Sequence, residues 1–219
     1  MDIFGGIIAI FSVALFASTI RAATPLILAA LGGIFSERSG IVNIALEGIM
    51  LIGAFFAMMI SYYGAQSGFP PLVSAVAGMV GAMVFGFLIS MIHAVVSIRF
   101  RADQVVSGVA INILALGLTG FLLQLIFNTS GNSPSVPNLA AMPIPVLASI
   151  PVLGPIFFNQ PPIVYLALLA VPISAFVLFR TALGLRLRSV GEHPKAADTV
   201  GINVFRLRYL GVGLSGVLA

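Results

Sequence analysis

The feature that most constrains this sequence is a succession of apolar runs, several of them long enough to cross a bilayer. Clear runs cover residues 3–20, 72–98, 105–127 and 163–179. A membrane-spanning helix requires about 20 consecutive apolar residues. With 60% hydrophobic and only 7% charged residues, the chain carries more apolar surface than one soluble core buries. The sequence therefore predicts an all-α polytopic membrane protein, a bundle of transmembrane helices forming one domain over residues 1–219.

The basic residues are concentrated between two apolar runs, and they predict the orientation. Residues 180–208 carry six of the ten lysine and arginine residues. Basic loops lie on the cytoplasmic side of a membrane, so we expect this loop, together with residues 99–103, to lie inside. Residues 128–162 contain eight prolines and no charge, and we expect them to form a long external loop with an interfacial segment near residues 146–158. The net charge of +4 thus reflects orientation and gives no indication of nucleic-acid binding.

The stretch over residues 23–63 admits two architectures. Its first apolar run, residues 23–35, is only about 20 Å long as a helix, and a polar patch containing Glu37 and Arg38 follows it. Either the short run crosses the membrane and Glu37-Arg38 forms a cytoplasmic turn, or residues 23–63 cross once as an interrupted helix. The second architecture is favoured, because it places Arg21 inside and because interrupted helices build transporter sites.

Three polar residues at membrane depth predict a path for a polar solute. Glu47 follows Asn43 by four residues, so on a helix both side chains face one side. A charge within a span is costly, about 2.5–3.5 kcal/mol on insertion scales. Glu47 therefore either lines a solute path, together with Asn43 and Asn112, or forms a structural ion pair with Arg38. For Asn112, an interhelical hydrogen bond is the simpler explanation.

Glycines recur in two of the expected spans. Small residues let helices approach closely, and this is the expected role of Gly78, Gly81, Gly86, Gly117 and Gly120. The sequence contains no cysteine, no phosphate-binding loop of the G-x-x-x-x-G-K-[ST] type, no H-E-x-x-H zinc motif and no supported catalytic triad. We therefore expect no catalytic residue, metal or cofactor in this chain. Energy for active transport would come from another subunit or from an ion gradient.

The basic loop contains a short helix of its own. The residues from Gly191 to Pro194 predict a turn into this helix, with Pro194 at its first position and Gly201 placed to end it. A short helix held between two spans can transmit a push from a partner to both of them. The alternative is a solvated basic loop that acts only as a topology signal.

Four segments carry a family resemblance. They are SERSGIVNIALEGIMLIGAF at 36–55, ADQVVSGVAINILALGLTGFLL at 102–123, RTALGLRLRSVGEHPKAADTVGIN at 180–203 and LRYLGVGLSGVLA at 207–219. These segments resemble the permease subunits of ATP-binding-cassette (ABC) importers, in the type II-like branch that carries ribose, branched-chain amino acids and nucleosides. The form GIVNIALEG at 40–48 is similar to the nucleoside importers.

The resemblance implies a permease that imports a nucleoside, or a related simple sugar, across a bacterial inner membrane. It also implies three partners: a cytoplasmic ATPase that binds the ATP, a second permease subunit, and an extracytoplasmic substrate-binding lipoprotein. The residues expected to couple to the ATPase are Gly191, Glu192, Pro194, Ala196, Ala197 and Gly201. The loop departs from the family pattern, since Lys195 stands where glutamate is usual and the following Ile-x-Leu-Pro is absent. Because family members are longer, further helices are expected after Ala219.

Two other functions are open on the sequence alone. A secondary transporter of a small polar solute would be driven by an ion gradient. It would need a carboxylate within the spans to bind the coupling ion, and Glu47 is the good candidate for that role. A membrane scaffold without transport activity would leave Asn43 and Glu47 unexplained.

Overall fold

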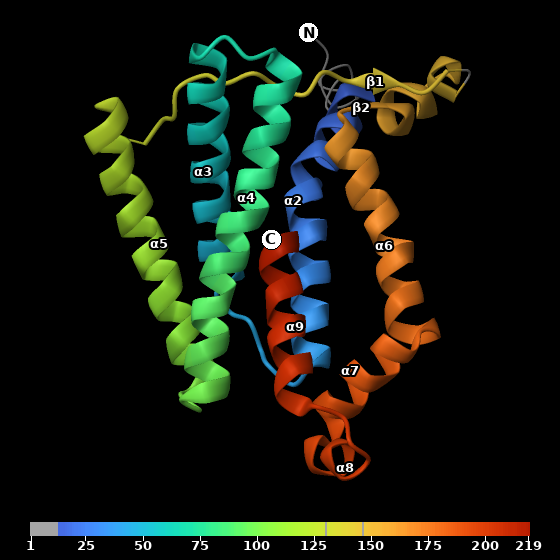
Figure 1. Ribbon diagram of the computed structural model, residues 1–219. Coiled ribbons are helices and arrows are strands. Elements are labelled where there is room, and N and C mark those ends of the chain that lie inside the picture. Colours follow the sequence, from blue (N-terminus) through green and yellow to red (C-terminus); the bar gives the residue numbers. More distant parts are fainter. Residues whose placement is uncertain (1–12, 130, 146) are drawn as a thin grey trace, which may run out of the picture.

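The computed structural model describes residues 13–129, 131–145 and 147–219, which form a bundle of long helices (Figure 1). The long helices are α2 (Val13–Arg38), α3 (Leu46–Gln66), α4 (Pro71–Ala94), α5 (Gln104–Phe127) and α6 (Pro162–Arg180). All five are long and apolar enough to cross a membrane. The prediction of an all-α multi-pass membrane protein is confirmed.

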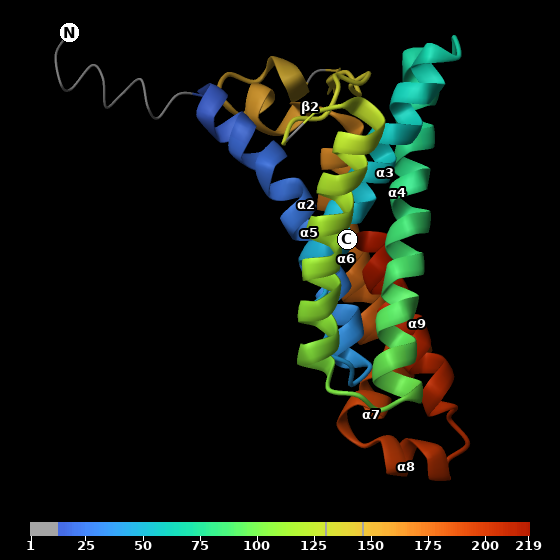
Figure 2. The ribbon, with the colours of Figure 1, turned by 90° about the vertical axis from the view of Figure 1, so that its left-hand side faces the viewer.

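Shorter elements lie at the two ends of the bundle. They are η1 (Val95–Arg99), β1 (Met142–Pro143), η2 (Leu147–Ser149), η3 (Gly154–Phe158), β2 (Asn159–Gln160), α7 (Ala182–Glu192) and α8 (Pro194–Thr199). Helix α9 (Val204–Leu218) runs from the lower end into the bundle and packs against α2 and α4 (Figure 1). The strands β1 and β2 pair antiparallel in the loop before α6. In both views α8 projects beyond the other helices at the lower end (Figures 1 and 2).

Local sequence signals explain where several helices begin. Proline stands in the first turn of α4, α6 and α8, where its missing N–H leaves no helical bond unmade. The carboxylate of Asp103 accepts the backbone N–H groups of Val105 and Val106, at 2.8 and 3.1 Å, and so caps α5. The side chain of Asn203 caps α9 in the same way.

Residues 23–63 form two crossings, and the favoured prediction of a single interrupted crossing is wrong. Helix α2 continues without a break to Arg38 and is about 39 Å long, and α3 runs back in the opposite direction (Figure 1). Residues 39–45 join the two helices without being helical themselves. Of the predicted first span, residues 3–12 lie outside the described residues, and residues 13–20 belong to α2.

Arg21 lies at the opposite end of the bundle from the predicted one. Its Nη1 donates to Oε1 of Gln160 at 3.1 Å, in the loop before α6. Gln160 is fully buried, and its Nε2 donates to the carbonyl oxygen of Ile156 at 2.6 Å. Because this folded loop receives the guanidinium, α2 extends past Arg21 and does not end there.

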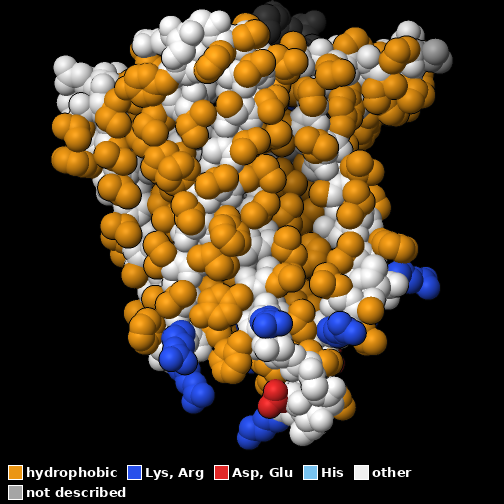
Figure 3. Space-filling model, in the orientation of Figure 1, with side chains coloured by type: hydrophobic (Ala, Val, Ile, Leu, Met, Phe, Trp, Pro, Cys, Tyr) orange, Lys and Arg blue, Asp and Glu red, His pale blue; other side chains and the backbone are white. Residues whose placement is uncertain are grey.

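The other basic residues gather at one end of the bundle. Figure 3 shows Lys and Arg side chains at the lower end and a largely apolar surface above them. This end contains residues 99–103 and 180–208, whereas residues 131–145 and 147–162 lie at the other end (Figure 1). The positive-inside rule makes the basic end cytoplasmic.

Glycines bring α4 close to its neighbours. A Cβ on Gly78 would lie 2.6 Å from the carbonyl oxygen of Ala57 in α3, and a Cβ on Gly86 would collide with the carbonyl oxygen of Gly216 in α9. In α5, by contrast, a Cβ on Gly117 or Gly120 would meet no described atom within 4 Å. The predicted close approach is confirmed for α4 and is wrong for α5 within the part of the chain that the structure describes.

Single cysteines are expected to report this topology, because the sequence contains no cysteine of its own. In intact cells, a membrane-impermeant maleimide should label Ser135→Cys, which lies in the external loop. It should label Ala102→Cys and Lys195→Cys only after the cells are opened. Labelling of Ser135→Cys restricted to opened cells would contradict the assignment of the basic end to the cytoplasm.

Candidate functional site

The segment between α2 and α3, residues 39–45, is irregular backbone that enters the bundle. Nδ2 of Asn43 donates to Oγ of Ser215 in α9 at 2.9 Å. Ser215 lies about 17 Å along α9 from Val204, at 1.5 Å per residue. Irregular backbone at such a depth is tolerated only where protein groups or enclosed water satisfy its N–H and C=O groups. The surroundings of this segment therefore form a candidate site.

Side chains from α4 and α5 satisfy the backbone of this segment. Oε1 of Gln104 accepts the N–H of Val42 at 2.7 Å. Nε2 of His93 lies 3.2 Å from the carbonyl oxygen of Val42 and donates to it, which leaves Nδ1 of the neutral ring to accept from Oγ of Ser107 at 3.1 Å. His93 is fully buried. No role could be predicted for it, because a lone histidine in an apolar run carries no signal of its partners.

Two of the predicted path residues fix the start of α3. Oδ1 of Asn43 accepts the N–H of Ala45 at 3.1 Å, and Oδ1 of Asn112 accepts the N–H of Gly48 at 2.8 Å. Nδ2 of Asn112 donates to the carbonyl oxygen of Ile44 at 3.1 Å. The first N–H groups of a helix have no partner within it, so the two amides supply what α3 lacks at its buried end.

Glu47 has different surroundings. It lies in the first turn of α3, where the helix dipole favours a carboxylate. Its side chain is exposed on the outside of the chain, whereas Asn43 is only 5% exposed. The expectation that both face one side is wrong, because Asn43 precedes the helix. Neither Arg38 nor any other residue in the described ranges forms an ion pair or hydrogen bond with Glu47.

The cytoplasmic end contains the predicted short helix. Helix α8 begins at Pro194, and Gly201 follows it with a φ of +81°, a left-handed conformation that glycine adopts without strain. A small apolar cluster of Val190, Ala197 and Val204 fixes α8 to α7 and α9. A force on α8 is therefore transmitted to both neighbouring helices.

The predicted coupling residues fall into two groups. Ala197 is 4% exposed, because its side chain packs in the cluster with Val190 and Val204. Gly191 lies in the last turn of α7, not in the predicted turn, and a Cβ there would lie 2.5 Å from the carbonyl oxygen of Arg38. Ala197 thus holds α8 against its neighbours, and Gly191 lets α7 approach the end of α2 closely. The others are exposed or half-buried around α8: Glu192, Pro194, Ala196 and Gly201.

Val200 is a candidate docking residue that was not predicted from the sequence. It directly follows α8, and its side chain is 74% exposed. Exposed apolar surface on a part that projects from the bundle is typical of a contact with another protein. Ala196 stands four residues earlier, within α8, and is also exposed. This spacing was visible in the sequence, but a helix this short gives little periodicity.

No group of three or more His, Cys, Asp or Glu residues that could hold a metal ion occurs in the described ranges. The structure has two candidate functional features. One is residues 39–45 inside the bundle, whose backbone is hydrogen-bonded by side chains of other helices, and the other is α8, which projects on the cytoplasmic side.

Comparison with known proteins identifies relatives of this arrangement. The guanosine ABC transporter permease protein NupQ of Bacillus subtilis is 51% identical over 205 residues, which cover 91% of this chain and 62% of NupQ. The nucleoside ABC transporter permease protein NupC of Lactococcus lactis is 46% identical over 198 residues, which cover 89% of this chain and 61% of NupC. The guanosine ABC transporter permease protein NupP of Bacillus subtilis is 26% identical over 202 residues, which cover 92% of this chain and 56% of NupP.

The matched region spans about three fifths of the length of these curated relatives. No solved structure matches. Residues 15–219 match the family described as branched-chain amino acid transport system / permease component, a match that includes every helix from α2 to α9 except the first two residues of α2. The chain therefore belongs to the family of branched-chain amino acid transport system permease components.

Proposed function

We propose that this chain belongs to the permease of an ABC importer that carries a nucleoside into the cell. The observation that carries the proposal is α8, which projects on the cytoplasmic side and presents Val200 to a partner. A separate ATPase that supplies the energy would need such a contact, because the sequence has no phosphate-binding loop. The similarity to the guanosine permease NupQ supports a nucleoside as the substrate.

In this proposal Glu47 faces the solute path. A carboxylate at membrane depth is too costly to face lipid, and Glu47 is exposed on the outside of the chain. The path therefore runs along this face of the chain, against further helices of the complete permease or a second permease subunit. Ribose hydroxyls and the donor groups of a base hydrogen-bond to a carboxylate. Asn43 and Asn112 contribute by fixing the start of α3, since their amide groups already bind its backbone.

The second permease subunit is a related but different chain in this proposal. NupQ and NupP of Bacillus subtilis are both named guanosine ABC transporter permease proteins, and this chain is 51% identical to the first and 26% to the second. The resemblance to NupQ thus favours a partner of the NupP type, with an ATPase and an external binding protein completing the importer.

Uptake of labelled guanosine by proteoliposomes tests the function. The complete permease is reconstituted with its ATPase, its partner permease and its binding protein. Uptake should require internal ATP hydrolysis and should persist when ionophores remove the ion gradients. Unlabelled nucleosides should compete, whereas leucine should not. Uptake by the permease alone, driven by an ion gradient, would identify a secondary transporter instead.

Glu47→Gln is expected to lower guanosine uptake about tenfold, the effect of weakening one hydrogen bond to a charged group. The amount and melting temperature of the assembled protein should change little, because no described residue pairs with Glu47 and only its interaction with the helix dipole, about 0.3–1 kcal/mol, is lost.

Asn112→Ala serves as the comparison for this variant. It should lower the melting temperature, because the Gly48 N–H and the Ile44 carbonyl lose their partner. If Glu47→Gln lowers stability and leaves uptake unchanged, Glu47 has a structural role and does not face the path.

A further inference from the structure

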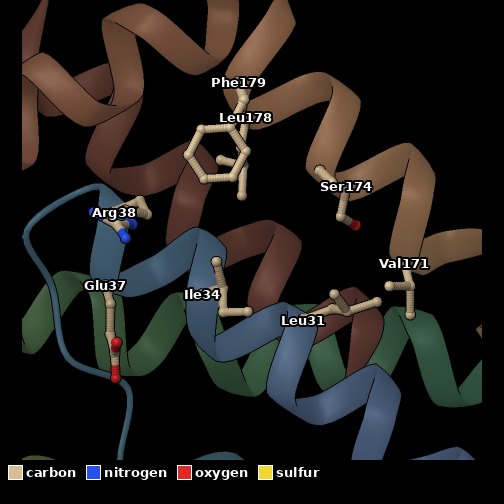
Figure 4. Close-up of a pocket in the computed structure, with 9 residues that line it drawn as sticks. Leu31, Ile34, Glu37, Arg38, Val171, Ser174, Leu178 and Phe179 are labelled. Atoms are coloured by element: carbon tan, nitrogen blue, oxygen red, sulfur yellow. The ribbon is translucent and has the colours of Figure 1, made fainter.

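A groove of about 610 Å³ lies between α2 and α6. Its walls are largely apolar, with Leu31 and Ile34 from α2 and Val171 and Leu178 from α6 (Figure 4). Ser174 adds one hydroxyl to this surface. Because both helices are membrane spans, the groove lies at the depth of lipid acyl chains.

The groove has a deep end and a cytoplasmic end. Helices α2 and α6 run in the same direction through the bundle (Figure 1), so Leu31 and Val171 lie at the deep end. Arg38 and Phe179, each at or next to the last residue of its helix, lie at the cytoplasmic end. Leu31 and Arg38 are about 10 Å apart along α2, which is enough for a lipid backbone and part of an acyl chain.

One arginine lines the cytoplasmic end of the groove, and a second contacts the lining residue Phe179. The guanidinium of Arg38 lines it and has no hydrogen bond or ion pair with another described residue. The guanidinium of Arg188, from α7, lies over the ring of Phe179 at 5.1 Å from its centroid, and its buried Nε has no hydrogen-bond partner in the described residues. Glu37 is the acidic residue of the lining, and Figure 4 shows its carboxylate directed away from Phe179.

We propose that this groove binds an anionic phospholipid of the cytoplasmic leaflet. Its phosphate lies between Arg38 and Arg188, because each guanidinium can donate two N–H groups to phosphate oxygens. One acyl chain follows the apolar walls toward Leu31 and Val171. Basic pockets between membrane helices on the cytoplasmic side are typical headgroup sites. A soluble phosphate would use the arginines but leave the apolar groove empty, whereas a phospholipid uses both.

Photolabelling of the complete, purified permease tests the proposal. A photoactivatable phosphatidylglycerol should label peptides that contain residues 31–38 and 171–179. The matching phosphatidylcholine probe, which has no net charge, should label them weakly. Arg38→Gln and Arg188→Gln should each lower the yield about fivefold, the effect expected for one basic residue near an anionic lipid.

A control for charge accompanies the arginine variants, and a variant that fills the groove is paired with a control for the added ring. Arg99→Gln removes an exposed arginine from the same end of the bundle, outside the groove, and should leave labelling unchanged. Ala175→Phe fills the groove from an exposed position and should abolish labelling of both peptides. Ile173→Phe adds the same ring at a 52% exposed position outside the lining and should have no effect.

Three results would overturn the proposal. The first is equal labelling by both lipids, and the second is labelling that the two arginine substitutions leave unchanged. The third is no labelling at all in the parent protein, which would show that another part of the complete permease fills the groove. Gel filtration of each variant before labelling confirms that it is folded.

Discussion

Replacement of Gly86 by valine is expected to abolish the assembled permease. Gly86 lies where α4 crosses α9, and a Cβ there would collide with the carbonyl oxygen of Gly216. A Cβ on Gly216 would in turn collide with the carbonyl oxygen of Gly86 and with Oγ of Ser90. Backbone atoms cannot rotate away as a side chain can, so the helices have to separate. We expect a cost of about 3 kcal/mol or more, at the upper end of the range for overpacked cores.

The separation would also affect the candidate site, because α9 carries Ser215, the partner of Asn43. The measurement is the yield and melting temperature of the protein after extraction in mild detergent. Gly117→Val is the matched control, since nothing described lies within 4 Å of a Cβ there. Because valine has a slightly higher helix propensity than glycine, this variant should keep the parent stability to within about 1 kcal/mol. Equal yields for the two variants would show that α4 and α9 are not packed as closely as described.

Three of the spans could be predicted almost to the residue, and the reason is local. The apolar runs of α4, α5 and α6 each begin after a proline or a capping aspartate. The span formed by α4 and η1 ends at Arg99, and α6 ends at Arg180. The length of α2 could not be predicted in this way, because an arginine at position 21 is typical of the end of a span. The partner that lets α2 continue past it is Gln160, which is 139 residues away in the sequence. No pattern near Arg21 carries that information.

The interruption between α2 and α3 can be recognised in the sequence, but its geometry cannot. Polar residues at 36–39 fit a turn as well as a break within one crossing. His93 and Gln104 hold the backbone of Val42 where the chain turns, and both come from other helices. The sequence pattern therefore locates the irregular segment. Whether the chain turns back or continues across the membrane after it depends on contacts between residues far apart in the chain.

The candidate site could be predicted only in part, for a similar reason. Polarity at membrane depth identifies Asn43, Glu47 and Asn112 as residues that need partners. It does not show that the two amides bind the α3 backbone while Glu47 is exposed on the outside of the chain. In α8, Ala196 and Ala197 are equivalent as far as sequence is concerned, although only Ala197 is buried.

Replacement of Val200 by aspartate is expected to lower ATP-driven guanosine uptake at least about 30-fold. Val200 is 74% exposed on the projecting cytoplasmic end, and a central apolar anchor typically contributes about 2 kcal/mol or more to an interface. A carboxylate there would have to be desolvated when the ATPase binds. The substitution should leave folding intact, because the side chain has no buried contact to lose. Co-purification of the ATPase with the complete permease, measured beside uptake, tests whether binding is the step affected.

Two further variants identify the cause of any loss. Phe100→Asp places the same charge at a 73% exposed apolar position on the cytoplasmic end but away from α8, and it should keep both binding and uptake. Ala197→Leu enlarges the buried residue of α8 itself and should lower the melting temperature as well as binding, because the added side chain overpacks the cluster with Val190 and Val204. Normal uptake by Val200→Asp would show that α8 is not the contact through which the ATPase acts. Equal losses in Val200→Asp and Phe100→Asp would attribute the effect to negative charge at the cytoplasmic end in general, since the two sites share exposure and charge but not their position relative to the docking helix.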